Sequence, residues 1–333
     1  MGLFFRKASL FILPFFILGL IYIAIDPYKK VWSYKNYNST LVMLNRGDVS
    51  TMVYLKNRSH YQYNSFIFGS SRSTSFTSRE WGKYLPKGSL AYSYGSWNEP
   101  IEGIYAKVAL LDSLHAPLKN ALIIVDVDRT FPKLDFNPIV NDHYLVSKKS
   151  KFDYHLSGLL SFYKSPVLVL SSLDYSIFHK KRGYMNGFIG QPSAELDSVN
   201  NDWAPDSEIG IEKDLKYYYS HPINKFYKRS GKQRVAEKSI SAEKQQCLEK
   251  IKAIFKKNGT NCKIIVSPLY DQIKLNPEDR VTLNKIFGAE NIYDYSGVNS
   301  VTNDVYNFSN DVIHYRKKAA NIILKEIYTP KAQ

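Results

Sequence analysis

The sequence predicts a three-layer α/β/α protein, in which a parallel, doubly wound sheet lies between helices and one apolar helix precedes it. Short apolar runs that end in Gly, Ser or Pro recur along the chain, and segments with apolar residues at helical spacing stand between them. One run, Ala121–Val127, is continuous, which is typical of a strand buried on both faces. Strands that alternate with helices in this way favour a doubly wound sheet.

The expected elements follow in order along the chain. The expected strands are 65–68, 89–94, 121–127, 263–266 and 291–295. The expected helices are a short one around 41–53, one carrying apolar residues from Ile101 to Leu114, a helical stretch over 153–182 broken or kinked at Pro166, one around 247–255 and a last one over 314–327. Asn258 and Gly259 form a good end for the fourth of these helices.

The expected organisation has a tail and membrane anchor over residues 1–26, a connector over 27–62 and one domain over 63–330. Residues from about 130 to 235 break the alternation of strands and helices, and we interpret them as an insertion. It would form either a lid or partner surface, or a passive surface excursion.

The N-terminal anchor rests on Ala8–Ile25, eighteen residues without a charge. No small-x-small cleavage site follows, so an uncleaved signal anchor is favoured over a removed signal peptide. Basic residues flank the span on both sides, so their count does not fix its orientation. A short tail before the span and a large domain after it favour a cytoplasmic tail and an extracytoplasmic domain.

Composition limits the classes of partner. With 333 residues, 44% of them hydrophobic and 23% charged, the chain can build a packed core. The net charge of +15 attracts anionic surfaces, but it is spread over short clusters and accompanies no nucleic-acid-binding motif. We therefore expect a lipid or polysaccharide surface and no nucleic acid. The 26 tyrosines suit sugar-like ligands, or simply reflect background composition.

The two cysteines, Cys247 and Cys262, lie near the start of a helix and at the start of the following strand. The helix would separate them by roughly 15 Å or more, so a disulfide is not favoured. The sequence has no metal-ligand set, phosphate-binding glycine loop or dinucleotide fingerprint, and we expect no cofactor.

Two short motifs could carry chemistry. Ser71 follows the first strand in a turn of small residues, at the sheet edge where ligands bind in open α/β sheets. Asp311 stands three residues before His314, so a carboxylate could orient an imidazole that activates the serine hydroxyl. Singly, such a serine usually caps a turn and such a histidine a helix. The order, serine after the first strand and Asp-x-x-His before the last helix, is more informative.

In these motifs the chain resembles the SGNH (GDSL-like) hydrolase superfamily, and more closely its bacterial membrane-anchored branch linked to cell-surface polysaccharide O-acylation and export. The first block of the family appears as Gly69-Ser70-Ser71-Arg72, and the fifth as Asp311 to His314. The resemblance implies a flavodoxin-like domain, Ser71 as nucleophile, His314 as base and Asp311 as its orienting group. It also implies an oxyanion hole made by the N–H groups of Ser71 and Gly95.

The chain departs from the family's pattern in the third block. The family places an asparagine in the oxyanion hole, whereas this chain has Asp126 and Asp128 after the third strand and no asparagine. The loss of one oxyanion donor costs on the order of 3 kcal/mol of barrier in mutated enzymes. Asn98 or Arg72 could substitute, and Asp126 could stabilise the architecture of the site. Arg72 could also bind an acidic group of the substrate, or pair with a nearby carboxylate.

The resemblance implies a membrane-anchored serine esterase or O-acyltransferase that acts on acyl, most often acetyl, groups of a cell-envelope polysaccharide. It implies a bacterial inner-membrane location with the domain outside, and a multi-pass membrane acyltransferase as a partner. One alternative is a non-catalytic protein of the same fold that binds glycan or assists export. A second is a tethered protein that binds anionic lipid or nucleic acid through charge alone.

Overall fold

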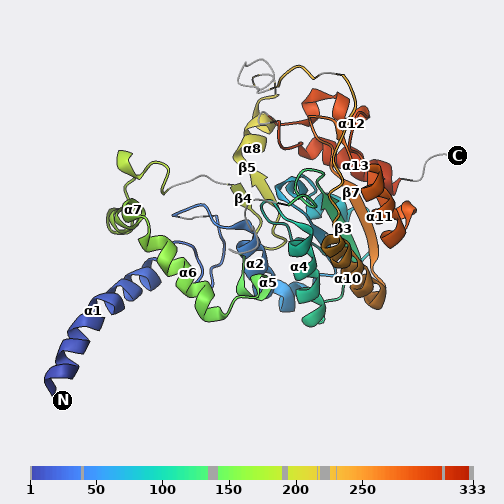
Figure 1. Ribbon diagram of the computed structural model, residues 1–333. Helices are drawn as coiled ribbons and strands as arrows, with labels where there is room; N and C mark the ends of the chain where they lie inside the picture. Colours follow the sequence, from blue (N-terminus) through green and yellow to red (C-terminus); the bar gives the residue numbers. More distant parts are fainter. Residues whose placement is uncertain are drawn as a thin grey trace. The chain divides into compact units, whose positions relative to one another are not determined.

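The computed structural model describes residues 2–38, 41–133, 142–189, 194–215, 217, 226–229, 231–309 and 312–329 (Figure 1). The chain forms two compact units. The first combines Met1–Asn45 with Lys148–Ser193, and the second combines Arg46–Ser147 with Ala194–Gln333. The expected insertion is therefore divided between the two units.

The second unit contains the sheet. Its five strands, all parallel, lie in the order β2 (Ala91–Ser93), β1 (Ser65–Phe68), β3 (Asn120–Val125), β7 (Asn261–Val266), β9 (Ile292–Asp294). The chain starts at β1, adds β2 on one side, and then adds β3, β7 and β9 on the other. This is a doubly wound order with its reversal between β1 and β3, so the predicted parallel α/β architecture is confirmed.

The sheet is buried on both faces because its strands are apolar at consecutive positions. Every residue of β1 and β3 is buried. Ile67 and Leu122 belong to one core, which also contains Trp81 of α3 (Ser78–Gly82) and Ile323 of α13 (Lys317–Tyr328). Helices therefore cover this face.

Neighbouring side chains on the same strands point to the opposite face. The ring of Phe66 contacts Tyr54 of α2 (Arg46–Tyr61) with centroids 5.8 Å apart. In the same unit, α4 (Ile101–Ser113) packs on α10 (Ala242–Asn258), and α10 packs on α11 (Pro277–Phe287). The unit thus has helices on both sides of a central sheet.

Several smaller elements complete this unit. They are η1 (Ser71–Ser75), α5 (Tyr144–Ser147), β4 (Ala194–Leu196), β5 (Trp203–Pro205), α8 (Asp206–Lys213), β6 (Arg234–Val235), β8 (Ile273–Lys274), η4 (Ala289–Asn291), α12 (Ser300–Asn303) and η5 (Val305–Asn307). β4 and β5 form an antiparallel pair, and β6 pairs with β8.

Two predicted helix boundaries were wrong. The helix expected over 41–53 begins at Arg46, because Leu41 and Val42 pack into the core of the first unit instead. The last helix begins at Lys317 rather than at His314. An antiparallel bridge between Phe308 and Tyr315 holds the preceding residues as a loop.

The first unit contains α1 (Gly2–Ile25), α6 (Lys151–Tyr163), α7 (Pro166–Phe178) and η3 (Gly183–Met185). Among the described helices, α1 is the one that is by itself long and apolar enough to cross a membrane. The predicted break at Pro166 is confirmed, since α6 and α7 meet at 91°. The core of the unit consists of Tyr22, Val42, Phe162, Leu168, Met185 and Ile189.

Cys247 and Cys262 form no disulfide with each other, in agreement with the sequence argument against one. Burial raises the pKa of the Cys262 thiol to about 12.

Candidate functional site

The turn after β1 places a serine at the carboxyl edge of the sheet. Gly69 has a φ of 149°, and a Cβ atom there would lie 2.7 Å from the carbonyl oxygen of Ile124. Only glycine fits this position. The side chain of Ser70 then caps η1 by accepting a hydrogen bond from the N–H of Arg72 at 3.2 Å. Ser71, the first residue of η1, therefore stands beside the reversal point of the sheet, where doubly wound proteins bind ligands.

Ser71 meets a histidine from the other end of the domain. The Oγ of Ser71 lies 2.8 Å from the Nε2 of His314, which is 243 positions later in the chain. His314 belongs to the loop that the Phe308–Tyr315 bridge closes, and its carbonyl oxygen accepts hydrogen bonds from the N–H and the hydroxyl of Ser309. An imidazole nitrogen within hydrogen-bond reach of a hydroxyl is the arrangement that lets a base take the serine proton.

The third expected member of this group, Asp311, lies outside the described residues. Its role as the group that orients His314 stays a prediction. The neighbouring Val312 has a φ of 54°, a conformation that β-branched residues rarely adopt. Backbone strain of this kind costs on the order of 1–3 kcal/mol and concentrates at functional sites.

Arg72, in η1, connects this helix to the loops that follow β3 and η5. Its Nε donates to the carbonyl oxygen of Ile313 at 2.9 Å, and its two terminal nitrogens contact the carboxylate of Asp128 at 2.5 and 3.1 Å. Burial lowers the pKa of Arg72, but the charges of Asp126 and Asp128 more than offset this effect and raise it above the ordinary value. Arg72 is 5% exposed, so its contacts are those of the carboxylate pair and not those of a substrate-facing cation.

Asp126 supports the structure of the turn that carries Ser71 (the serine turn, residues 69–71). It is fully buried, its Oδ2 accepts a hydrogen bond from the hydroxyl of Ser70, and its backbone N–H donates to the hydroxyl of Thr130 at 2.8 Å. Its Oδ1 lies 3.5 Å from a guanidinium nitrogen of Arg72 without forming a hydrogen bond. The Asp126 carboxylate is thus engaged by Ser70 and Arg72, the residues on either side of Ser71.

Gly95 packs directly against the serine turn. A Cβ atom at this position would lie 2.6 Å from the Oγ of Ser73 and 3.0 Å from the carbonyl oxygen of Gly69. Within the described part of the chain, neither the N–H of Gly95 nor that of Ser71 donates a hydrogen bond. Both N–H groups are therefore available to an external acceptor such as a developing oxyanion.

Asn98, the weaker candidate for the oxyanion hole, lies in the turn after Gly95. Its φ is 46° and it is half-buried. The next residue, Glu99, holds this turn in place through a buried ion pair with Lys107. Among the described residues, no hydrogen bond joins Asn98 to Ser71 or His314.

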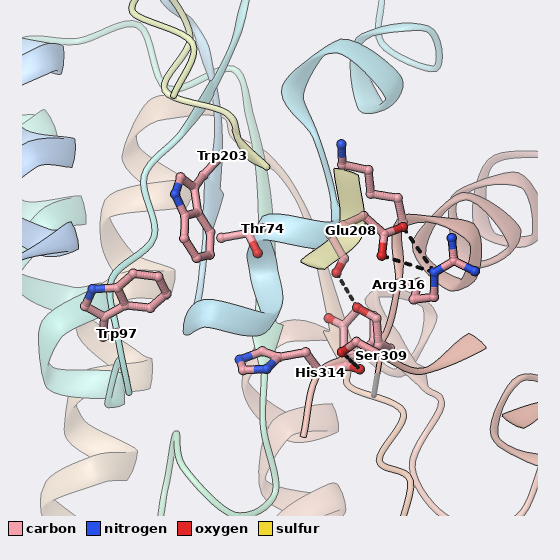
Figure 2. A pocket seen from close by; sticks show the side chains of 10 residues that line it. Thr74, Trp97, Trp203, Glu208, Ser309, His314 and Arg316 are labelled. Carbon is pink, nitrogen blue, oxygen red and sulfur yellow. Dashed lines mark hydrogen bonds and ion pairs between the residues drawn. The ribbon is translucent and has the colours of Figure 1, made fainter. Parts of the chain in front are cut away.

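A cavity of about 180 Å³ opens beside His314 (Figure 2). Two indoles form one side of it: the rings of Trp97 and Trp203 meet edge to face, with centroids 4.7 Å apart. On the other side, Arg316 and Glu208 form a buried ion pair at 3.1 Å. The cavity therefore offers aromatic faces and a fixed pair of charges to a ligand that reaches the histidine.

The insertion supplies part of this cavity, which the sequence did not predict. Trp203 and Glu208 come from β5 and α8. The segment before them is fastened to the sheet domain, because buried Arg46 bonds the side-chain and backbone oxygens of Asn201, and Asp202 accepts hydrogen bonds from the N–H and hydroxyl of Ser78 at 2.8 Å. The one available signal was a tryptophan within a polar, turn-rich stretch.

Comparison with known proteins adds no family: no family model matches the chain, and no curated protein matches it at a significant level. Among the described residues, no group of three His, Cys, Asp or Glu side chains is placed to hold a metal ion.

Proposed function

We propose that the chain is a membrane-anchored serine esterase or O-acyltransferase of the SGNH kind. The observation that supports this most directly is the 2.8 Å contact between the Oγ of Ser71 and the Nε2 of His314 at the reversal point of the sheet. The residues come from opposite ends of the domain, so their meeting is a property of the fold and not of local sequence.

In the proposed reaction, the Oγ of Ser71 attacks the carbonyl carbon of an ester while its proton passes to the Nε2 of His314. This requires the neutral histidine tautomer that carries its proton on Nδ1. The oxyanion forms near the unpaired N–H groups of Ser71 and Gly95. The alcohol leaves with the proton from His314, and Ser71 keeps the acyl group. Water or a sugar hydroxyl then attacks the acyl-serine and gives its proton to His314, which passes it to the Oγ of Ser71 as the acyl group leaves.

The cavity beside His314 supports a small, partly polar substrate group. Pockets for drug-sized ligands measure about 300–1,000 Å³, so a cavity of about 180 Å³ suits a single sugar ring or a short acyl chain. Indole faces pack against the apolar faces of sugars, and the Glu208–Arg316 pair offers hydrogen-bond partners at the opposite wall. These features favour an acylated glycan of the cell envelope, with acetyl as the acyl group.

The membrane helix supports the proposed location. With α1 across the bacterial inner membrane and the domain on its outer side, the chain stays beside membrane-borne acyl donors. A multi-pass membrane acyltransferase is the partner that this arrangement suits. Protease treatment of spheroplasts tests the orientation, since digestion of the domain only after the inner membrane is lysed would contradict it.

The experiment that tests catalysis is labelling of the full-length, detergent-solubilised protein with a fluorophosphonate, which reacts with activated serines. We expect labelling of the parent and of Ser176→Ala, a control at an exposed position of α7, and none of Ser71→Ala or His314→Gln. Mass spectrometry locates the label. A folded parent that does not react, alone or with its membrane partner, rules out the catalytic proposal.

A second candidate is a glycan-binding protein of the same fold without catalysis. The carboxylates at the position of the family's asparagine favour it, because Asp126 and Asp128 offer no oxyanion donor. In that case oligosaccharide binding persists in Ser71→Ala and is lost in Trp203→Ala, measured by titration calorimetry. Loss of both labelling and binding contradicts both candidates.

A further inference from the structure

Helix α7 carries an exposed apolar stripe. Val167, Leu170, Ile177 and Phe178 lie on one side of the helix and are 39%, 61%, 66% and 61% exposed. The other side is packed, since Leu168 belongs to the buried core of the first unit. Monomeric soluble proteins rarely leave such a face in water.

Helix α7 contacts α1 within the same unit. These contacts show which part of α1 lies beside α7. The hydroxyl of Tyr163, at the end of α6, donates to the carbonyl oxygen of Leu18 at 2.6 Å, and the rings of Phe162 and Tyr22 lie 5.9 Å apart. Both α6 and α7 contact α1. The junction between α6 and α7 therefore lies beside the C-terminal turns of the apolar helix.

Trp32 marks the membrane boundary at the C-terminal end of α1. Its indole N–H donates to the carbonyl oxygen of Ile23 at 2.9 Å, and the side chain is 56% exposed. Exposed tryptophans at the end of a membrane helix sit at the headgroup level. Leu18 precedes Ile23 by five residues, about 7.5 Å at 1.5 Å per residue. The contact of Tyr163 with Leu18 thus lies below the headgroup level, where the acyl chains begin.

The chain turns at this level. α6 and α7 meet at 91°, with Ser165 capping α7 and Pro166 in its first turn. α7 has 13 residues, about 20 Å of helix at 1.5 Å per residue, which is too short to cross a hydrocarbon core of about 30 Å. A helix too short to span, with an exposed apolar side at this depth, is suited to lie in the interface.

Basic residues flank the helix at both ends. Lys164 precedes it and Lys180 and Lys181 follow it, all three exposed. The acidic residue within the stripe, Asp174, is compensated, because it pairs with Arg182 at 2.7 Å and accepts a hydrogen bond from the hydroxyl of Tyr184. Each lysine near a membrane surface is attracted to anionic headgroups.

We propose that α7 lies in the lipid interface of the leaflet that the C-terminal turns of α1 cross, with its apolar stripe among the acyl chains and its flanking lysines at anionic phospholipid headgroups. This contact is additional to the membrane span. It rests on α1 as the span and not on the reaction at Ser71.

The test uses the full-length chain with Cys247→Ser and Cys262→Ala, one new cysteine and an environment-sensitive NBD probe. The probe is attached at Leu170→Cys on the stripe, at Ser176→Cys on another side of α7, or at Val281→Cys in the sheet domain as a control; all three positions are exposed. The protein is reconstituted into phosphatidylcholine vesicles with or without phosphatidylglycerol. A phospholipid carrying a nitroxide near the top of its acyl chain quenches probes that touch lipid.

We expect several-fold stronger quenching and a blue-shifted emission at position 170 relative to 281, with position 176 between them. We also expect Lys164→Gln with Lys180→Gln and Lys181→Gln to reduce quenching in phosphatidylglycerol vesicles to the level in phosphatidylcholine alone. Equal quenching at 170 and 281 overturns the proposal. A probe at 170 that is shielded from both the lipid nitroxide and aqueous iodide also overturns it, because a protein then covers the stripe.

Discussion

The guanidinium of Arg72 holds the backbone of Ile313, the residue before His314, through a hydrogen bond of 2.9 Å from its Nε. The same guanidinium binds Asp128 with both terminal nitrogens. One buried side chain next to Ser71 therefore fixes the position of the loop that carries His314. This planar, forked geometry is a property of arginine that lysine lacks.

Replacing Arg72 by lysine separates charge from geometry. Arg72→Lys keeps a positive charge near Asp128, but a single ammonium cannot also hold the carbonyl of Ile313. Hydrogen bonds to charged groups contribute about 1.5–3 kcal/mol, so we expect the rate of fluorophosphonate labelling at Ser71 to fall by on the order of tenfold or more. An unchanged labelling rate in a folded variant excludes this positioning role.

The Arg72–Asp128 pair predicts a dependence of stability on pH. Burial raises the pKa of Asp128, but the hydrogen bond and charge of Arg72 outweigh it and hold the pKa below its ordinary value of 3.8. A lowered pKa means that the unfolded chain binds protons first, so the stabilisation is full above pH 3.8 and is lost as the pH falls through the folded-state value. We expect Asp128→Asn to be less stable than the parent at neutral pH, with the difference shrinking below that point. Urea unfolding across this range measures it, and a constant difference contradicts the assignment.

Gly95 is predicted to tolerate no side chain. Gly95→Ala places a Cβ 2.6 Å from the Oγ of Ser73 and 3.0 Å from the carbonyl of Gly69, so the backbone must shift. We expect a loss of about 1–3 kcal/mol of stability from overpacking. If Gly95 serves as the proposed oxyanion donor, its displacement also lowers the acyl-transfer rate by about 10²–10³-fold. Gly82→Ala is the matched control, since a Cβ at Gly82 meets nothing within 4 Å. Equal effects of the two changes on stability and rate would show that the close packing of Gly95 against the serine turn does not matter.

The buried pair of Glu99 and Lys107 supports the turn that contains Gly95 and Asn98. Both side chains are at most 1% exposed. Lys107→Met leaves the Glu99 carboxylate unpaired, and we expect a loss of about 3–5 kcal/mol in the free energy of unfolding. The double variant Glu99→Gln with Lys107→Met removes the stranded charge and should recover much of that loss. A single variant as stable as the parent in denaturant titration would contradict the pairing.

The sheet and the first two members of the site followed from local patterns. Ala121–Val127 was predicted as a strand because it is a continuous apolar run, as in strands that are buried on both faces. The structure places β3 at Asn120–Val125. Ser71 and His314 were identified from their order relative to strands and helices, which the doubly wound topology brings together. The sequence did not show whether Arg72 binds a substrate or a nearby carboxylate. The same residues, Arg72 beside Ser71 and two aspartates after the third strand, are compatible with both arrangements.

The cavity wall was beyond prediction for a different reason. Trp203 reaches the cavity through contacts made far away in sequence, such as the bond from Arg46 to Asn201. No periodicity in residues 183–210 indicates these contacts. The same holds for Leu41 and Val42, whose apolar run is equally compatible with a helix and with packing into another unit.

The division of the insertion has a consequence for how the chain is made. Residues 148–193 complete the core around Tyr22, so α1 is synthesised long before its packing partners. The first unit can finish folding only after β1 to β3 have left the ribosome, and the sheet can finish only after β7 and β9 follow. Removal of α1 would leave Phe162, Leu168 and Met185 without Tyr22, the side chain on which they pack. The synthesis of the two units is thereby interleaved on one chain.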